Sequence, residues 1–198
     1  MVKRIVFGGH VWQVRNYNGG PGPNKFSDTL VSIDSEGHLH LKIAKIGGIY
    51  HCSELYLEKP LGYGTYSFRV AKAPILDKKA ILGLFTYEND KNEIDIEFGS
   101  WGCNLFPGFQ FVVQPSKWSS YKKVYGYDCD ITSLFTWKKT GVDFKSDLWP
   151  FKPEWSFTKW SPQSVGKERV HINLWLLKGK APAAEQEVII KSFEFKPL

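Results

Sequence analysis

The sequence predicts an all-β protein, a sandwich of two β-sheets. Three observations lead to this prediction. Apolar and polar residues alternate with a period of two in many short segments, which is typical of β-strands. Glycine and proline recur between these segments at intervals too short for helices. No stretch carries apolar residues at positions i, i+3, i+4 and i+7 over three helical turns. With 198 residues, of which 42% are hydrophobic, the chain is long enough to bury a core.

The clearest alternation lies in residues 38–43, 65–70 and 188–195, and the last of these is expected to be partly covered on both faces. The other expected strands are residues 31–33, 52–57, 81–87, 93–98, 109–113, 134–137, 141–144 and 171–176. Residues 19–24 are the most turn-rich stretch, and we expect them to form a loop over the body of the protein. No linker, repeat or change in composition divides the chain, so we expect a single domain over residues 1–198.

Charge and cysteine content exclude several classes of function. The net charge is +6, but the basic residues are scattered and only four are arginines, so the chain lacks the basic stripe typical of nucleic-acid binding. No segment approaches the roughly 20 apolar residues that a membrane span needs. Cys52, Cys103 and Cys129 fit neither a metal-ligand spacing nor a disulfide framework, and one bridge would leave at least one thiol free. We therefore expect neither nucleic acid nor membrane as a partner.

The most informative segment is an acidic strand in the middle of the chain. Residues 81–98 are predicted to form two strands joined by a polar turn at residues 88–92. In the second strand the alternation places Glu93, Asp95 and Glu97 on one face, while isoleucine and phenylalanine occupy the other. Three like charges along one face repel one another. A merely solvated edge would carry lysines between or opposite the acids, and this strand does not.

Crowded carboxyl groups of this kind suit the cleavage of glycosidic bonds. They cannot all ionise together, so one pKa rises while another stays low. One neutral acid and one carboxylate are the pair that this cleavage requires. Glu93 and Glu97 are about 13 Å apart along a flat strand, whereas a retaining glycosidase holds its carboxyl groups about 5–5.5 Å apart. Two glutamate side chains that lean together over a concave sheet could close most of that gap.

The segment Asn-Glu-Ile-Asp-Ile-Glu-Phe at residues 92–98 resembles the signature of glycoside hydrolase family 16, the jelly-roll enzymes that include lichenases, laminarinases, agarases, carrageenases and xyloglucan transglycosylases. Further segments resemble family strands in the expected order along almost the whole chain: residues 62–70, 84–87, 134–137 with 141–144, 173–175 and 191–195. The resemblance implies a concanavalin A-like jelly roll with a concave substrate-binding face.

Carried over to this sequence, the resemblance implies that Glu93 is the nucleophile, Glu97 the general acid/base and Asp95 the assisting carboxylate. It implies a retaining, endo-acting β-glycanase, with a β-1,3/1,4-glucan as the expected substrate. The alternatives are a transglycosylase, a hydrolase of xyloglucan, laminarin or a sulfated galactan, and a glycan-binding jelly roll without turnover. The three crowded acids argue against the last of these, since a binder does not need them.

Sugar rings present flat apolar faces edged by hydroxyls, so a glycan site needs aromatic, amide and carboxylate side chains. The matching motifs make the following residues candidates for substrate binding: Asn24, Phe26, Glu54, Phe85, Tyr87, Trp101, Gln110, Gln114, Asn173 and Trp175. Trp118 is a more speculative candidate, whereas Trp12 and Trp137 are expected in the core. The five histidines fit no catalytic or metal set, and we expect them to be surface or hydrogen-bonded polar residues.

Some positions depart from the family pattern. Lichenases usually have a tryptophan where this chain has Lys91, and the family has an amide where this chain has Val112. In the family, a proline commonly follows the tryptophan that corresponds to Trp137, and this chain lacks that proline. These departures leave the acids intact but bear on the choice of substrate. Lys91 is expected to be a solvated turn residue, with contact to an anionic sugar as the alternative.

The resemblance implies no required cofactor and no catalytic metal, and it allows a structural Ca²⁺ ion, although no acidic cluster identifies its site. The expected partner is a polysaccharide, and the protein is expected to be a monomer. The first residues reach Gly8 and Gly9 before any signal-length apolar region forms. We expect a secreted protein whose signal peptide is not part of this sequence, with a cytoplasmic protein as the alternative.

Overall fold

The computed structural model describes residues 2–71, 75–103, 108–115, 121–125, 130–148, 150 and 152–198, the segment 121–125 by its backbone alone. Trp118 and Cys129, which the sequence singles out, lie outside these residues. In the part of the chain that is described, no helix is long and apolar enough to cross a membrane. Cys52 is a buried free thiol and Cys103 an exposed one.

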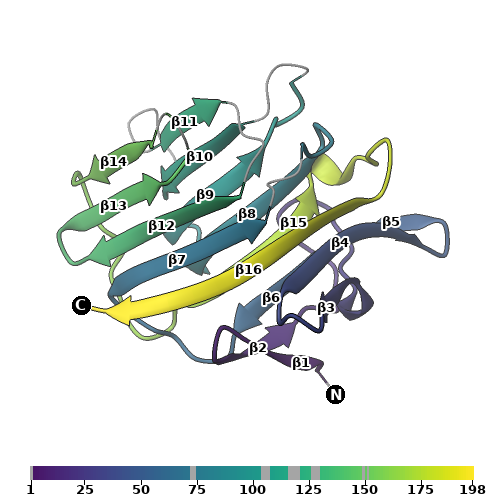
Figure 1. Cartoon of the computed structure of the whole chain (residues 1–198), viewed down its shortest axis with the longest axis horizontal. Coiled ribbons are helices and arrows are strands. Elements are labelled where there is room, and N and C mark those ends of the chain that lie inside the picture. Colours follow the sequence, from purple (N-terminus) through teal and green to yellow (C-terminus); the bar gives the residue numbers. More distant parts are fainter. Residues whose placement is uncertain are drawn as a thin grey trace.

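Two antiparallel β-sheets pack face to face (Figure 1). The first, which we call the groove sheet, has the strand order β1 (Arg4–Phe7), β2 (His10–Val14), β6 (Ser53–Leu57), β15 (Arg169–Leu176), β8 (Ala80–Asn89), β9 (Asn92–Gly99), β10 (Gly108–Val113) and β11 (Tyr121–Tyr125). The second, the outer sheet, has the order β14 (Glu154–Phe157), β13 (Gly141–Ser146), β12 (Ile131–Lys138), β7 (Gly64–Ala71), β16 (Gln186–Pro197), β4 (Leu39–Ile46) and β3 (Val31–Ile33), and β5 (Ile49–His51) pairs with β4. Two short 3₁₀ helices, η1 (Asp28–Leu30) and η2 (Leu177–Gly179), complete the described elements. The predicted all-β sandwich is confirmed.

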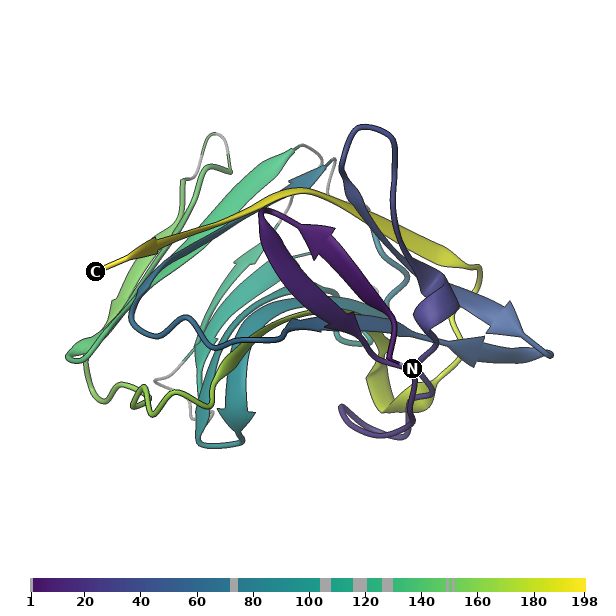
Figure 2. The ribbon, with the colours of Figure 1, turned by 90° about the horizontal axis from the view of Figure 1, so that it is seen from below.

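Both sheets curve in the same direction (Figure 2). Strand β16 runs over the outer side of the arch, and strands β8 and β9 lie on its inner side. The inner face of the groove sheet is therefore concave, and side chains that project from this face converge.

The core lies between the sheets, and central strands of the outer sheet alternate buried and more exposed residues. Strand β12 is buried at every second position, and β7 follows nearly the same pattern. Trp12 and Trp137 are fully buried, as expected, and their indole N–H groups donate to the carbonyl oxygens of Phe7 and Pro162, each over 2.9 Å. Both indole N–H groups are therefore satisfied inside the core that lies beneath the concave face.

Several strands were not expected from the sequence. They are β1, β2, β5, β11 and β14. The hairpin of β1 and β2 turns at Gly8 and Gly9, which both have positive φ (57° and 75°), and such a glycine pair between alternating segments is a recognisable hairpin signal. The turn in the acidic hairpin is also tighter than expected, because β8 continues to Asn89 and β9 begins at Asn92.

Candidate active site

The pairing of neighbouring strands places polar residues in one row across the concave face. Glu97 of β9 lies beside Gly83 of β8, Gly83 beside Asn173 of β15, and Asn173 beside Glu54 of β6. Paired residues of neighbouring strands point to the same face of a sheet, so these side chains share the concave side. The backbone N–H of Arg15 donates to the carbonyl of Glu54 over 2.9 Å, which extends the row to the end of β2.

A second row runs beside the first and is mainly aromatic. Asp95 pairs with Phe85, Phe85 with His171, and His171 with Tyr56. The His171 ring stacks between the rings of Tyr56 and Phe85, with centroid distances of 5.3 and 5.0 Å. Tyr87, next on the same face of β8, contacts the His171 ring edge-on. The concave floor therefore combines flat apolar rings with acids and amides.

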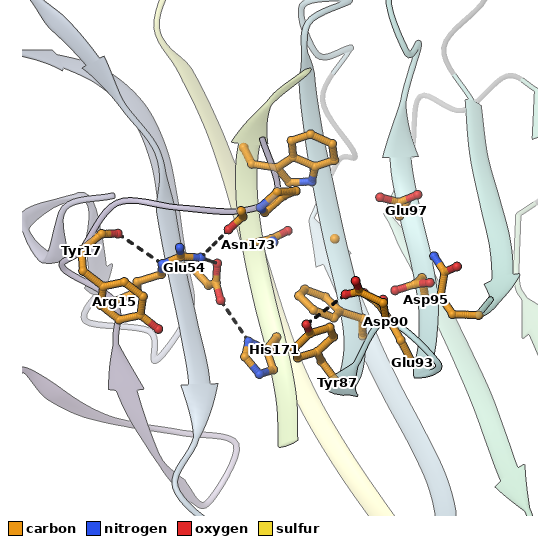
Figure 3. Close-up of a pocket in the computed structure, with 16 residues that line it drawn as sticks. Arg15, Tyr17, Glu54, Tyr87, Asp90, Glu93, Asp95, Glu97, His171 and Asn173 are labelled. Carbon is orange, nitrogen blue, oxygen red and sulfur yellow. Dashed lines mark hydrogen bonds and ion pairs between the residues drawn. The ribbon is translucent and has the colours of Figure 1, made fainter. Parts of the chain in front are cut away.

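A pocket of about 560 Å³ opens on these two rows (Figure 3). Its lining includes predicted site residues, namely Glu54, Phe85, Tyr87, Glu93, Asp95, Glu97, Gln114, Asn173 and Trp175. The other residues that line it were not predicted as site residues: Arg15, Tyr17, Gly20, Pro21, Gly83, Asp90 and His171. All three acids of β9 thus reach one cavity, and Figure 3 shows them in line along the strand.

Neighbouring strands hold the acids of β9 in place. Gln110 of β10 pairs with Glu97 and donates its side-chain N–H to Glu97 Oε2 over 2.7 Å. The side chain of Gln114 forms a hydrogen bond with the Asp95 carboxyl group, and the backbone N–H of Gln114 donates to the carbonyl of Glu93 over 3.0 Å. Asp95 Oδ2 is buried without a hydrogen-bond partner among the described residues.

Burial raises the pKa of all three acids, so the prediction from the sequence that one of these pKa values stays low is wrong. For Glu93 burial raises the pKa to about 7, opposed by the hydrogen bond from Asp95 and assisted by the charges of Glu97 and Asp90. Burial also raises the pKa of Asp95 well above its ordinary value, and the charges of Glu93 and Glu97 add to the effect. For Glu97 burial raises the pKa against the opposing hydrogen bond from Gln110. The row therefore keeps protons near neutral pH, with a protonated Asp95 donating to the Glu93 carboxylate.

The raised pKa of Glu93 predicts a pH-dependent gain of stability when this acid is removed. Below the ordinary glutamate pKa of 4.5, Glu93 is protonated whether the chain is folded or not, so its charge costs nothing. Between pH 4.5 and about 7 the unfolded chain releases this proton while the folded protein still holds it, so the free energy of unfolding falls across this range and is level above it. We expect Glu93→Gln to raise that free energy by about 1–3 kcal/mol at pH 8 and to leave it unchanged at pH 4. Urea unfolding at both pH values measures the effect.

Glu194→Gln is the matched control, because Glu194 is an exposed acid on β16. It should change the unfolding free energy little at either pH. A Glu93→Gln variant with the same stability difference from the parent at pH 4 and pH 8 would contradict the burial argument.

At the other end of the pocket, Glu54 is held by two partners. Arg15 Nη1 donates to Glu54 Oε2 over 2.7 Å, and His171 Nδ1 donates to Glu54 Oε1 over 3.0 Å. Burial raises the pKa of Glu54, but the hydrogen bonds and charges of His171 and Arg15 outweigh burial, so this pKa lies below its ordinary value. Glu54 is thus ionised and has both carboxyl oxygens paired within the protein.

Arg15 also holds the turn-rich loop expected at residues 19–24. Its Nη1 donates to the carbonyl of Gly20 over 2.7 Å and its Nε to the carbonyl of Tyr17 over 3.3 Å. The ring of Phe26 packs 3.9 Å from the guanidinium carbon. Because Tyr17, Gly20 and Pro21 line the pocket, Arg15 determines the shape of this end.

Four predicted binding residues lie outside the pocket lining. Asn24 is buried and donates to the carbonyls of Pro21 and Leu176, and Phe26 is buried beside Arg15. Gln110 holds Glu97 from the neighbouring strand β10, and Trp101 is not among the lining residues. In this structure, Asn24 and Phe26 therefore stabilise the loop that shapes the pocket.

The structure shows the surroundings of two positions that depart from the family pattern, Lys91 and Val112. Lys91 is an exposed residue of the β8–β9 turn, as expected. Val112 is buried and pairs with Asp95, so an apolar side chain neighbours the acid there.

His171 and Gly83 could have been found from alternation alone. His171 stands two residues before Asn173 and Gly83 two residues before Phe85, so each shares a face with a predicted site residue. His171 is hydrogen-bonded, as expected of the histidines, but it also forms part of the pocket wall. Among the residues with described positions, no group of three or more His, Cys, Asp or Glu side chains could hold a metal ion.

The chain was compared with protein families, curated sequences and solved structures, and only the solved structures gave matches. No protein-family model and no curated protein sequence matches the chain. A β-glucanase of Bacillus licheniformis superposes with a TM-score of 0.75 at 21% identity, covering 94% of this chain and 92% of that one. A β-1,3-1,4-glucanase (lichenase) from a mouse hindgut metagenome gives a TM-score of 0.76 at 17% identity, covering 98% and 96%. A Mycobacterium tuberculosis protein described as an immunostimulatory antigen and pseudo β-1,3-glucanase gives 0.68 at 20% identity, covering 91% and 88%. The chain therefore has the jelly-roll fold of β-glucanases, and the predicted resemblance is confirmed at the level of the fold.

Proposed function

We propose that this protein is a retaining, endo-acting β-glycanase of glycoside hydrolase family 16 that hydrolyses β-1,3/1,4-linked glucan. One observation carries the proposal: three acids of one strand, Glu93, Asp95 and Glu97, line a single pocket on a concave sheet, and burial raises the pKa of each. Partly protonated carboxyl groups that face one cavity supply the acid and the nucleophile that double displacement at a glycosidic bond requires. We further propose that it acts as an extracellular monomer.

In the proposed reaction, Glu97 donates its proton to the oxygen of the leaving sugar while the Glu93 carboxylate attacks the anomeric carbon. The bond between that carbon and the leaving oxygen breaks, and a covalent glycosyl-enzyme forms. Glu97, now a carboxylate, takes a proton from a water molecule as the water oxygen attacks the anomeric carbon, and the bond between this carbon and the Glu93 carboxylate breaks. The protonated Asp95 donates a hydrogen bond to Glu93, which stabilises its carboxylate before attack and as a leaving group.

The rest of the pocket suits a neutral polysaccharide. Phe85, Tyr87 and Trp175 supply aromatic surface for sugar faces. The lining also includes five carboxyl groups, and its guanidinium, Arg15, is already paired with Glu54. A sulfated galactan would bring further negative charge to this site, so a neutral β-glucan is the better substrate.

Glycan binding without turnover is the second candidate function. It is favoured by the similarity to the mycobacterial protein described as a pseudo β-1,3-glucanase. A binding protein would retain the aromatic and amide groups of the pocket, whereas the acid row on β9 has a function only in catalysis. The intact acid row makes hydrolysis the first choice.

The release of reducing sugar separates these candidates. The substrates to be compared are barley β-glucan, laminarin, xyloglucan, agarose and carrageenan, with and without added oligosaccharide acceptors. We expect the fastest release from barley β-glucan, and none from carrageenan. Longer products formed from the acceptors would instead identify a transglycosylase. Binding to one of these polymers without release from any of them would identify the glycan-binding protein and contradict the proposal.

A further inference from the structure

Gly83 lies at the centre of the polar row, between the proposed acid/base and the amide of β15. It pairs with Glu97 on one side and with Asn173 on the other. Neighbouring strands are about 4.7–4.9 Å apart, so the backbones of Glu97 and Asn173 are separated by roughly 10 Å, with only the backbone of Gly83 between them. The floor of the pocket therefore has no side chain of its own at this point.

The side chain of Asn173 occupies the space above Gly83. A Cβ atom added to Gly83 would lie 2.5 Å from Asn173 Oδ1 and 3.5 Å from its Cγ. The carboxamide thus reaches from β15 over β8, in the direction of the β9 acids (Figure 3). Only glycine leaves room for this arrangement, because any other side chain begins where the oxygen lies.

Asn173 Oδ1 lies in this position without a partner. The residue is buried and lines the pocket, and its Oδ1 has no hydrogen-bond partner among the described residues. An unpaired buried acceptor costs about 1–3 kcal/mol, so such groups usually await a ligand or an ordered water. In a glycan pocket the donor that fits is a sugar hydroxyl.

We infer that Gly83 is a positioning residue that lets Asn173 lean over β8 and accept a hydrogen bond from a hydroxyl of the sugar bound beside Glu97. The inference rests on the proposed function, since it concerns the sugar in that same site. Gly83 does not touch the reacting atoms and acts through Asn173.

The local geometry predicts that Gly83→Ala leaves the fold intact. Gly83 is not among the residues with positive φ, so alanine can adopt its backbone conformation. The atom that would clash most closely is the end of a rotatable side chain, and the next contact, with Phe85 Cδ1, is 3.4 Å. The new methyl group should therefore displace the Asn173 carboxamide and leave the backbone of β8 in place.

A double-mutant cycle tests the inference. We expect Gly83→Ala and Asn173→Ala each to lower kcat/KM on β-glucan by about 10- to 100-fold, mainly through KM, since each removes one buried hydrogen bond to the sugar. If Gly83 acts through Asn173, adding Gly83→Ala to Asn173→Ala should change kcat/KM less than about twofold. Additive losses in the double variant, or a Gly83→Ala variant as active as the parent, would overturn the inference.

A structure of the Gly83→Ala variant separates this inference from the proposed function. We expect the Asn173 carboxamide to rotate away from residue 83 and the melting temperature to stay within a few degrees of the parent's. An unmoved carboxamide would overturn the inference whatever the enzyme activity. By contrast, a parent protein that hydrolyses none of the glycans would overturn the proposed function, while the movement of Asn173 could still be observed.

Discussion

Glu93→Gln is expected to lower kcat/KM on β-glucan by at least about 10³-fold, because the variant has no carboxylate to attack the anomeric carbon. The amide is nearly isosteric, and the other two acids of the row remain. The expected loss therefore reports on chemistry, and its measurement is the rate of reducing-sugar release. Binding of a gluco-oligosaccharide to the same variant, followed by calorimetry, should persist.

Azide rescue distinguishes the roles of the two glutamates. In Glu93→Ala, azide should occupy the vacated space and attack an activated aryl β-glycoside to give the α-glycosyl azide. In Glu97→Ala, the nucleophile is intact, so azide should attack the glycosyl-enzyme and give the β-glycosyl azide. Opposite anomers from the two variants would support the assignment. The same anomer from both, or hydrolysis that survives in Glu93→Gln, would refute it.

Arg15→Met is expected to lower the free energy of unfolding by about 3–5 kcal/mol, since it leaves the Glu54 carboxylate buried with one partner fewer. The side chains of Arg15 and Glu54 are only 8% and 6% exposed. The variant also leaves the carbonyls of Gly20 and Tyr17 without their donor. Denaturant unfolding at pH 7 measures the loss.

Two control variants make this prediction specific. Arg4→Met removes the partner of Glu58 in an exposed ion pair, with side chains 61% and 27% exposed, and should cost no more than about 1 kcal/mol. Adding Glu54→Gln to Arg15→Met should restore part of the lost stability, because the unpaired buried charge is then gone. Equal losses in Arg15→Met and Arg4→Met would show that burial of the Arg15–Glu54 pair does not contribute.

Alternation in the sequence predicted the features that depend on one strand at a time. It placed Glu93, Asp95 and Glu97 on one face of a strand, and the structure has them on one face of β9, all lining the pocket. Burial of Trp12 and Trp137 was also expected and is confirmed. The unexpected strands β5 and β14 have only three and four residues, too few for a period-two pattern to stand out.

Features that depend on contacts between distant segments could not be predicted in the same way. The resemblance made Asn24 a candidate for substrate binding, and in the structure its carboxamide donates to the carbonyl of Leu176, 152 positions away. Arg15 was not singled out in the sequence, yet it pairs with Glu54 and holds the turn-rich loop. Both outcomes depend on which strands become neighbours in the sheet, and local patterns carry no such information.

The sequence by itself determined the all-β class and the acid row, since both follow from the period of two that any extended chain imposes on its side chains. Only the tertiary structure decided which groups surround that row. The order β6, β15, β8, β9 and β10 brought Glu54, Asn173, Gly83 and Gln110 into register with Glu97, and the curvature of the sheet turned them into one pocket. Strand order and register arise from packing of the whole core. The pKa values of the acids and the partners of Glu54 therefore depend on tertiary contacts and could not be derived from the sequence.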